Sequence, residues 1–160
     1  MTQIRVRDVM TTQVVTLKAT NTVKQATVKL AVDSISGVPV VDEKHRIIGI
    51  VSETDILNLL LKYQAKLNTD DPSLYMLLSP MDDDSQEEHV RAASKAISET
   101  LVKDIMTVTL ITTTPDAKLV DVVKVMIERG VNRIPVLEKG VLVGVISRAD
   151  VIFAVYKRKA

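Results

Sequence analysis

Two segments of the chain combine a glycine, a serine and an aspartate at a spacing that suits the phosphate and ribose of a nucleotide. They read GIVSETD at 49–55 and GVISRAD at 144–150, and each lies where an apolar strand is expected to run into a helix. The free N–H groups and partial positive charge at a helix N-terminus favour a phosphate. The serine hydroxyl can donate to that phosphate, the aspartate can accept from both ribose hydroxyls, and the glycine lets another group approach the strand closely.

The same serine and aspartate also fit a purely structural role. Ser52 or Ser147 at the N-cap, with Asp55 or Asp150 three residues later, forms a capping box in which Asp replaces the usual Glu or Gln. For one segment alone, capping explains the pattern at least as well as ligand binding does. The pattern occurs twice at an equivalent junction, which favours ligand binding, and both interpretations stay open.

Both segments belong to a longer internal repeat. VRDVMT at 6–11 matches VKDIMT at 102–107, and GVPVV at 37–41 matches RIPVL at 133–137. The offset between these blocks is 96 residues, and it becomes 95 for the glycine-serine-aspartate segments. The two copies therefore differ by one deletion, which we place in the turn near 44–46. A repeated unit of this kind usually buries its apolar face against its twin, and two equivalent units create two equivalent clefts.

Each copy is predicted to fold as a β-α-β-β-α unit, which places the chain in the α/β (α+β) class. Apolar residues recur at the helical period after a first β-branched segment, and near-continuous apolar runs predict two further strands before the last helix. The expected strands are 14–17, 38–42 and 46–52 in the first copy, and 110–114, 133–138 and 141–147 in the second.

The ends of the first helix in each copy carry recognisable signals. Thr20 or Thr22 is the expected N-cap in the first copy, and Asp116 is the expected N-cap in the second. Gly130 is well placed to end the helix of the second copy, and Ser34 is its counterpart.

The boundaries of the repeat predict a first domain at 6–61, a connection at 62–101 and a second domain at 102–156. Within the connection, a short helix is expected at 73–78 and a longer one at 88–101. An acidic cluster at 82–88 could form a weak cation site, but solvated carboxylates at a helix N-terminus are the stronger interpretation.

Composition narrows the classes of function. The 160 residues carry a net charge of +1, contain no cysteine and are only 2% aromatic, so the core must be Val, Ile, Leu, Ala and Met. We expect no disulfide, thiol nucleophile, membrane span, signal peptide or nucleic-acid partner. The only histidines, His45 and His89, lie far apart, so we expect no metal site and no catalytic triad. We expect a cytoplasmic protein that is not an enzyme.

The order of the blocks, DxMT, β-branched strand, helix, PV and then GhhSxxD (h, hydrophobic), resembles the cystathionine-β-synthase domain, or CBS domain. The resemblance covers 6–61 and 102–156 and occurs twice in the same order. It implies a tandem pair that packs through its sheets about a pseudo-twofold axis, with two clefts for adenosine-containing ligands. It further implies that such pairs assemble into a flat, disk-shaped homodimer.

The resemblance also implies which residues would contact a ligand. One cleft would use Gly144, Val145, Ser147 and Asp150 of the second copy with Arg7, Met10, Thr12, Ile35 and Ser36 of the first. The other would use Gly49, Ile50, Ser52, Thr54 and Asp55 with Lys103, Met106, Val108, Val131 and Asn132. In each cleft the aspartate would hold the ribose, apolar residues would sandwich the base, and backbone groups would read its edge. At Met10 and Met106, core packing is the stronger interpretation and ligand contact the alternative.

Two charged positions make the expected clefts unequal. Arg133 matches a position that often holds phosphate in the family, and its counterpart is the uncharged Gly37. Arg148 likewise has Glu53 as its counterpart. One cleft could therefore be empty or prefer another ligand.

We therefore expect a regulatory module that binds an adenine nucleotide of the AMP, ADP or ATP class, as in energy sensing, and signals through conformation or assembly. It would need no cofactor, form a homodimer and act on an unidentified protein partner. The alternatives are a structural interaction module without ligand, a sensor of S-adenosylmethionine or NAD, and a nucleotide hydrolase.

Overall fold

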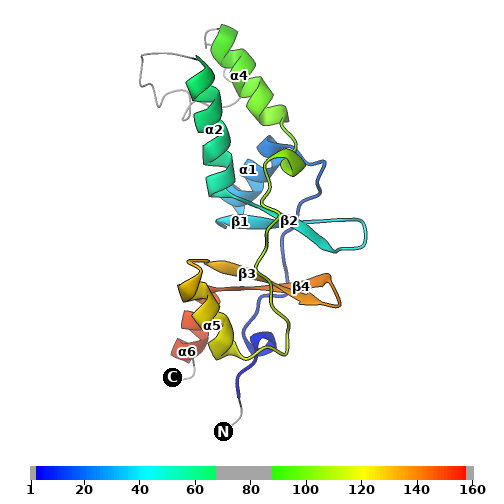
Figure 1. The fold of residues 1–160 in the computed structure, drawn as a ribbon, viewed down its shortest axis with the longest axis vertical. Coiled ribbons are helices and arrows are strands. Elements are labelled where there is room, and N and C mark those ends of the chain that lie inside the picture. The colour runs from blue at the N-terminus through cyan, green and yellow to red at the C-terminus, as the bar shows by residue number, and fades with distance from the viewer. Residues whose placement is uncertain (1–2, 68–87, 158–160) are drawn as a thin grey trace. The chain divides into compact units, whose positions relative to one another are not determined.

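The computed structural model describes residues 3–67 and 88–157, in which the chain divides into two units built from non-contiguous segments (Figure 1). Unit 1 contains Met1–Thr16, Val41–Ile48 and Thr109–Ala160. Unit 2 contains Leu17–Val40 and Gly49–Val108. The N-terminal segment of the first repeat thus belongs with the helices and strands of the second repeat, so neither unit coincides with one repeat.

The described residues form a mixture of helices and strands with two two-stranded sheets, which confirms the α/β (α+β) class. The first repeat contains η1 (Val6–Asp8), α1 (Val23–Val32), β1 (Gly37–Val41), β2 (Ile47–Ser52) and α2 (Glu53–Leu67). After α4 (Glu88–Glu99), the second contains η2 (Val102–Asp104), α5 (Leu119–Glu128), β3 (Arg133–Glu138), β4 (Val141–Ser147) and α6 (Arg148–Lys157). The predicted helix at 88–101 is therefore confirmed as α4, whereas the predicted helix at 73–78 and most of the acidic cluster lie outside the described residues.

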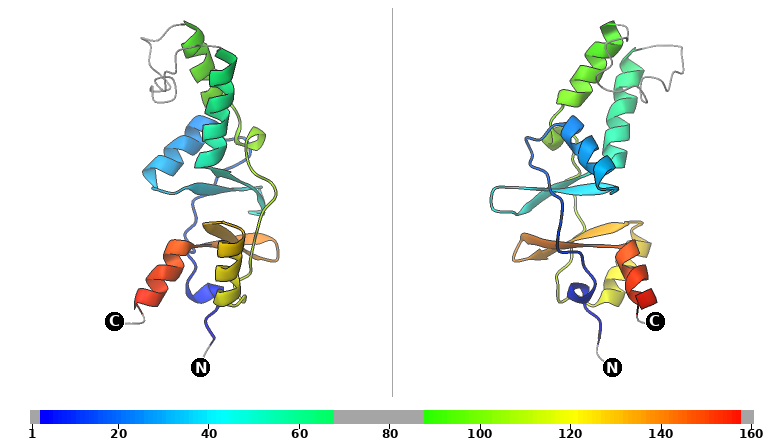
Figure 2. Two further views of the ribbon diagram at one scale, coloured as in Figure 1. Left: turned by 60° about the vertical axis from the view of Figure 1, so that its left-hand side comes forward. Right: turned by 180° about the vertical axis from the view of Figure 1, so that it is seen from behind.

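In unit 1, α5 and α6 contact each other and lie on one face of the antiparallel β3–β4 hairpin (Figure 2). The helices and strands enclose an aliphatic core, to which the N-terminal segment contributes through η1. The core residues are Val6, Leu119, Val122, Met126, Ile134, Val136 and Ile146. Phe153 and Tyr156 are 60% and 72% exposed, as the aliphatic-core prediction requires.

In unit 2, α1, α2 and α4 contact one another (Figure 1). Their apolar faces bury Val23, Ala26 and Leu30 of α1, Ile56 and Leu59 of α2, and Ile97 of α4. The segment at 100–103 is tied to the start of α1 by backbone hydrogen bonds, from Val23 to Thr100 and from Val102 to Asn21, both at 2.8 Å. These bonds fix the register of the segment that leads into the second DxMT motif.

The predicted first strand of each repeat is reduced to a single parallel bridge, Leu17 with Val40 and Thr113 with Val136. The backbone N–H of Leu17 donates to the carbonyl oxygen of Pro39 at 2.9 Å, and that of Thr113 donates to Pro135 at 3.0 Å. The carbonyl oxygen of each proline accepts this bond. Because proline has no N–H, it cannot donate a bond back to the first segment, and the ladder ends there.

Three of the four helix-end predictions are confirmed. Thr22 caps α1, because its side chain accepts from the N–H of Gln25 while its own N–H donates to the Gln25 side chain. Ser34 and Gly130 both adopt the left-handed conformation, with φ of 51° and 63°. The prediction for Asp116 is wrong: Lys118 is the N-cap of α5 and makes no side-chain bond there.

The hairpin turns account for the one-residue difference between the repeats. In the second repeat Lys139 and Gly140 both have positive φ, as expected for a two-residue type I′ turn. In the first repeat the turn is one residue longer, and the left-handed position falls on His45 with φ of 60°. No helix in the part of the chain described by the structure is both long and apolar enough to cross a membrane.

Candidate functional site

The junction between β4 and α6 in unit 1 is closed by reciprocal hydrogen bonds between Ser147 and Asp150. The backbone N–H of Ser147 donates to Oδ2 of Asp150 at 2.8 Å, and the N–H of Asp150 donates to Oγ of Ser147 at 3.1 Å. This is the predicted capping box. Oγ of Ser147 acts as an acceptor here and donates to no residue that the structure describes, which leaves its hydroxyl hydrogen available to a ligand.

The equivalent junction in unit 2, between β2 and α2, differs in one hydrogen bond. The N–H of Ser52 donates to Oδ2 of Asp55 at 2.8 Å, and the N–H of Asp55 donates to Oγ of Ser52 at 3.3 Å. Oγ of Ser52 also donates to Oδ2 of Asp55 at 3.0 Å. The hydroxyl hydrogen of Ser52 is therefore already engaged within the protein.

A threonine that the sequence interpretation overlooked completes each junction. Oγ1 of Thr11 lies 3.4 Å from Oδ1 of Asp150, and Oγ1 of Thr107 lies 3.2 Å from Oδ1 of Asp55. Both threonines end the repeated DxMT motif, so the repeat itself carried the signal that could have identified them.

These threonines are fixed by backbone hydrogen bonds to the strand that precedes each junction. Thr11 exchanges two bonds of 2.9 Å with Val145, and Thr107 exchanges bonds of 2.8 and 2.9 Å with Ile50. The DxMT segment is thus an added edge of the strand, and it holds the threonine hydroxyl beside the aspartate.

The glycines are explained by the methionines that precede these threonines. A methyl group on Gly144 would lie 2.8 Å from Sδ of Met10. A methyl group on Gly49 would lie 2.5 Å from Sδ of Met106. The group that approaches each strand closely is therefore a methionine side chain, and the core-packing interpretation of both methionines is supported.

Arg133 lies directly opposite Ser147 in the β3–β4 ladder. Directly opposed residues of an antiparallel pair project from the same face of the sheet. Nε of Arg133 is buried and has no hydrogen-bond partner among the described residues. A buried N–H donor without a partner is costly, so this guanidinium is suited to an incoming acceptor.

The other two arginines near this junction are already engaged. Arg148 donates from Nε to the carbonyl oxygen of Val131 at 3.2 Å and from Nη2 to that of Met126 at 2.9 Å. It thereby satisfies carbonyl groups at the C-terminal end of α5. Arg7 pairs with Asp116, which explains why that carboxylate does not cap α5.

The structure distributes the remaining predicted contacts between the two units. Unit 1 contains Arg7, Met10, Thr12, Val131, Asn132, Arg133, Gly144, Val145, Ser147 and Asp150, and unit 2 contains Ile35, Ser36, Gly49, Ile50, Ser52, Thr54, Asp55, Lys103, Met106 and Val108. Ser36 accepts a hydrogen bond from the N–H of Glu53 at 3.1 Å, and Asn132 accepts one from Arg148 at 3.0 Å. These bonds tie Ser36 and Asn132 to the junction of their own repeat, and their grouping with the opposite aspartate stays a prediction.

A family model described as the CBS domain matches residues 6–62 and 102–157. Protein MJ1426 of Methanocaldococcus jannaschii is 32% identical over 124 residues, which cover 76% of this chain and 74% of that protein. The chain spans 41% of the length of protein MJ1225 of Methanocaldococcus jannaschii and 59% of the length of the CBS domain-containing protein CBSX1, chloroplastic, of Arabidopsis thaliana.

Two solved structures illustrate the similarity of fold. CBSX2 in complex with AMP has a TM-score of 0.72 at 23% identity, covering 98% of both chains. The CBS domain pair of protein MJ0100, in complex with 5′-methylthioadenosine and S-adenosyl-L-methionine, has a TM-score of 0.65 at 19% identity, covering 99% of this chain and 100% of that one. At these identities the two structures establish the fold.

Proposed function

Because the chain belongs to the CBS domain family, we propose that it is a regulatory module that binds adenosine-containing ligands at its two strand-to-helix junctions. The observation that carries the proposal is the carboxylate of Asp150 or Asp55, held by the serine three residues earlier and by the threonine of the DxMT motif. The 3.4 Å contact of Oδ1 in unit 1 is long for a hydroxyl bond, so this oxygen can accept from a ribose. That two proteins of similar fold were solved with AMP or with S-adenosylmethionine supports the same ligand class.

We assign the more highly phosphorylated ligand to unit 1. Its junction offers the hydroxyl hydrogen of Ser147 and the buried, unpartnered Nε of Arg133 on the same face of the sheet. Hydrogen bonds from a guanidinium to a phosphate are charge-assisted and about twice as strong as neutral ones. On the DxMT side of this junction, Thr12 would lie beside the nucleoside.

Unit 2 offers less to a phosphate. The hydroxyl of Ser52 already donates to Asp55, and Gly37 replaces the arginine. A ligand with little or no negative charge, such as adenosine or an adenosyl thioether, is the better match. Lys103 and Val108 would flank it on the DxMT side.

The output of binding would be a change of assembly or of partner affinity, because we assign no catalytic role to either junction. Exposed apolar side chains lie on the helices, including Leu57 and Leu61 on α2 and Ile152 and Val155 on α6. Exposed apolar patches mark interfaces, and closed twofold dimers are the commonest assembly. We propose a cytoplasmic homodimer that regulates a protein partner.

Calorimetric titration with AMP, ADP, ATP and S-adenosylmethionine, compared with CMP and UMP, tests the ligand class. We expect adenine ligands to bind with Kd of roughly 1–100 μM and the pyrimidine nucleotides to bind more weakly. Equal binding of all nucleobases, or no binding by any, would contradict it. Unchanged ATP after incubation distinguishes a sensor from a hydrolase.

A further inference from the structure

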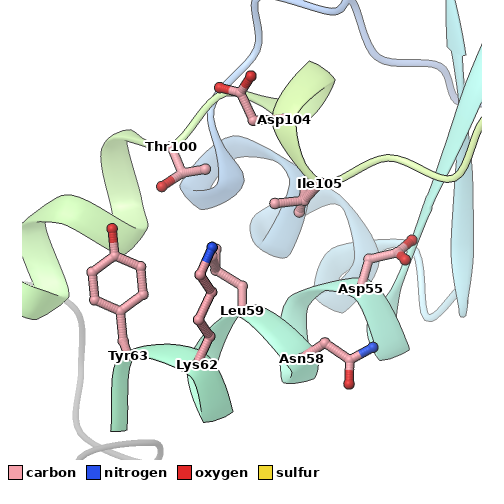
Figure 3. A pocket seen from close by; sticks show the side chains of 8 residues that line it. All are labelled: Asp55, Asn58, Leu59, Lys62, Tyr63, Thr100, Asp104 and Ile105. Atoms are coloured by element: carbon pink, nitrogen blue, oxygen red, sulfur yellow. The ribbon is translucent and has the colours of Figure 1, made fainter. Parts of the chain in front are cut away.

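A cavity lies beside α2 in unit 2, and it borders the junction at Asp55. Its volume is about 370 Å³. One wall is α2, which contributes Asn58 and Lys62, and the opposite wall is the segment from Thr100 to Ile105 (Figure 3). Asp55 borders the cavity, but both of its carboxylate oxygens already accept hydrogen bonds from Ser52 and Thr107.

The α2 wall supplies hydrogen-bond donors. Lys62 has three N–H donors and makes no hydrogen bond or ion pair with any residue that the structure describes. Figure 3 shows its ammonium directed from α2 toward the opposite wall. Asn58 lies one helical turn earlier, on the same face of α2, and carries two further N–H donors.

The opposite wall supplies acceptors. Oγ1 of Thr100 donates its hydrogen to the carbonyl oxygen of Ala96 at 2.7 Å, so only its lone pairs remain for a ligand. The carboxylate of Asp104 has no partner among the described residues. Its counterpart in the first repeat, Asp8, instead accepts from the N–H of Arg5 at 2.8 Å. Asp104 therefore does not make the backbone hydrogen bond that Asp8 makes in the first repeat.

Between the walls the surface is apolar. Leu59, which is 9% exposed, and Ile105 line the cavity, and Figure 3 shows the side chain of Ile105 projecting inward. The cavity therefore combines a cation, a carboxylate that is unpaired in the described part of the chain, and an aliphatic surface.

The internal repeat supplies a comparison within the same chain. Lys157 of α6 is the counterpart of Lys62, but its Nζ lies 5.6 Å from the ring centroid of Phe153, where unit 2 has Asn58. Ile4 stands where unit 2 has Thr100. The repeats therefore share the lysine and the aspartate, but the other repeat replaces both neutral polar residues of the cavity, Asn58 and Thr100, by apolar ones.

We propose that this cavity binds a free α-amino acid with an aliphatic side chain. Lys62 and Asn58 bind its carboxylate, Asp104 and Thr100 bind its ammonium, and Leu59 and Ile105 contact its side chain. A simple anion is excluded because it would lie beside Asp55 and Asp104, and a simple cation because it would lie beside Lys62. A zwitterion satisfies both walls, and this inference does not depend on nucleotide binding at the junctions.

The test is calorimetric titration of the nucleotide-free protein with L-leucine, L-isoleucine, L-valine and L-methionine. N-acetyl-L-leucine lacks the ammonium and L-leucinamide lacks the carboxylate, so each derivative removes one half of the zwitterion. We expect at least one free amino acid to bind, and both derivatives to bind at least about tenfold more weakly than L-leucine. Absence of binding by all four amino acids at millimolar concentration, or equal binding of the derivatives, would overturn the proposal.

Variants locate the binding. Lys62→Gln should weaken amino-acid binding at least about tenfold and remove the preference for L-leucine over L-leucinamide. Asn58→Phe, which copies the residue of the other repeat, should abolish binding by filling an exposed position without disturbing the core. Lys157→Gln is the matched control and should bind like the unaltered protein. Equal affinities of Lys62→Gln and Lys157→Gln would refute the assignment.

Discussion

Arg133 and Ser147 are directly opposed in the β3–β4 ladder, at the point where the strand meets α6. A hydroxyl whose hydrogen is bonded to no described residue and a guanidinium whose buried Nε has no partner within 3–67 and 88–157 therefore lie together at a helix N-terminus. All three features favour an anion, and only this junction combines them, because Gly37 occupies the place of Arg133 in the other repeat.

Replacing Arg133 should separate phosphate recognition from nucleoside recognition. Arg133→Gln should lower AMP affinity by roughly tenfold, since a charge-assisted bond is lost, and leave adenosine affinity unchanged. Calorimetry with the two ligands measures this difference. Lys124→Gln removes one positive charge from the exposed side of α5 and is the control. An equal loss for AMP and adenosine would show that Arg133 supports the site without contacting phosphate.

The glycines of the two junctions should be intolerant of a side chain because the methionines fill their space. Gly49→Ala should destabilise the protein by about 1–3 kcal/mol, the usual cost of overpacking. Gly37→Ala is the matched strand control, since its new methyl group would meet its nearest neighbours at 3.6 Å, an ordinary contact. Urea denaturation of both variants provides the comparison. Similar stabilities would contradict the packing role assigned to Met106.

Introducing a glycine at the C-terminal end of α1 and removing one at the end of α5 should change the stability of the protein in opposite directions. Ser34→Gly should stabilise the protein by up to about 1 kcal/mol, because glycine adopts positive φ without steric cost. Gly130→Ala should destabilise it by a similar amount. Thermal melts of the two variants check the prediction, and shifts of the same sign in both would contradict it.

The elements could be predicted from sequence to the extent that their signals are local. The repeat, the aliphatic core, the Thr22 cap and the left-handed ends at Ser34 and Gly130 follow from residue types and spacing. Full strands were predicted at 14–17 and 110–114, where the structure has one bridge each. The effect of Pro39 and Pro135 could not be foreseen, because it depends on which segment pairs with the proline. Asp116 was misassigned because its partner, Arg7, comes from the distant start of the chain.

The candidate site was predictable only in part. The serine–aspartate boxes are local in sequence, and their form is as expected. The threonines at 11 and 107 reach the aspartates from more than fifty residues away, so only the repeated motif could have indicated them. The hydrogen-bond state of each side chain, which separates Arg133 from Arg148 and Ser147 from Ser52, is a tertiary property that no spacing rule supplies.

Assembly should follow from the exposed apolar helices. Light scattering at tens of micromolar should give about twice the 17.6 kDa mass of the chain. Ile152→Asp places a charge on a side chain that is 70% exposed in one chain, and should shift the equilibrium toward monomer without altering the core. A monomer mass for the unaltered protein would contradict the proposed homodimer.

The most direct test of the account is to titrate Asp150→Asn, Asp55→Asn and the double variant with AMP and adenosine while measuring their melting temperatures. Asparagine keeps the shape and can still accept in the capping box, so stability should fall by about 1 kcal/mol or less. Ribose hydroxyls lose a charged acceptor, so affinity should fall about tenfold at the altered junction, and both sites should be weakened in the double variant. If the variants lose stability but bind adenine ligands like the unaltered protein, the aspartates act only as helix caps and the proposed ligand sites are wrong.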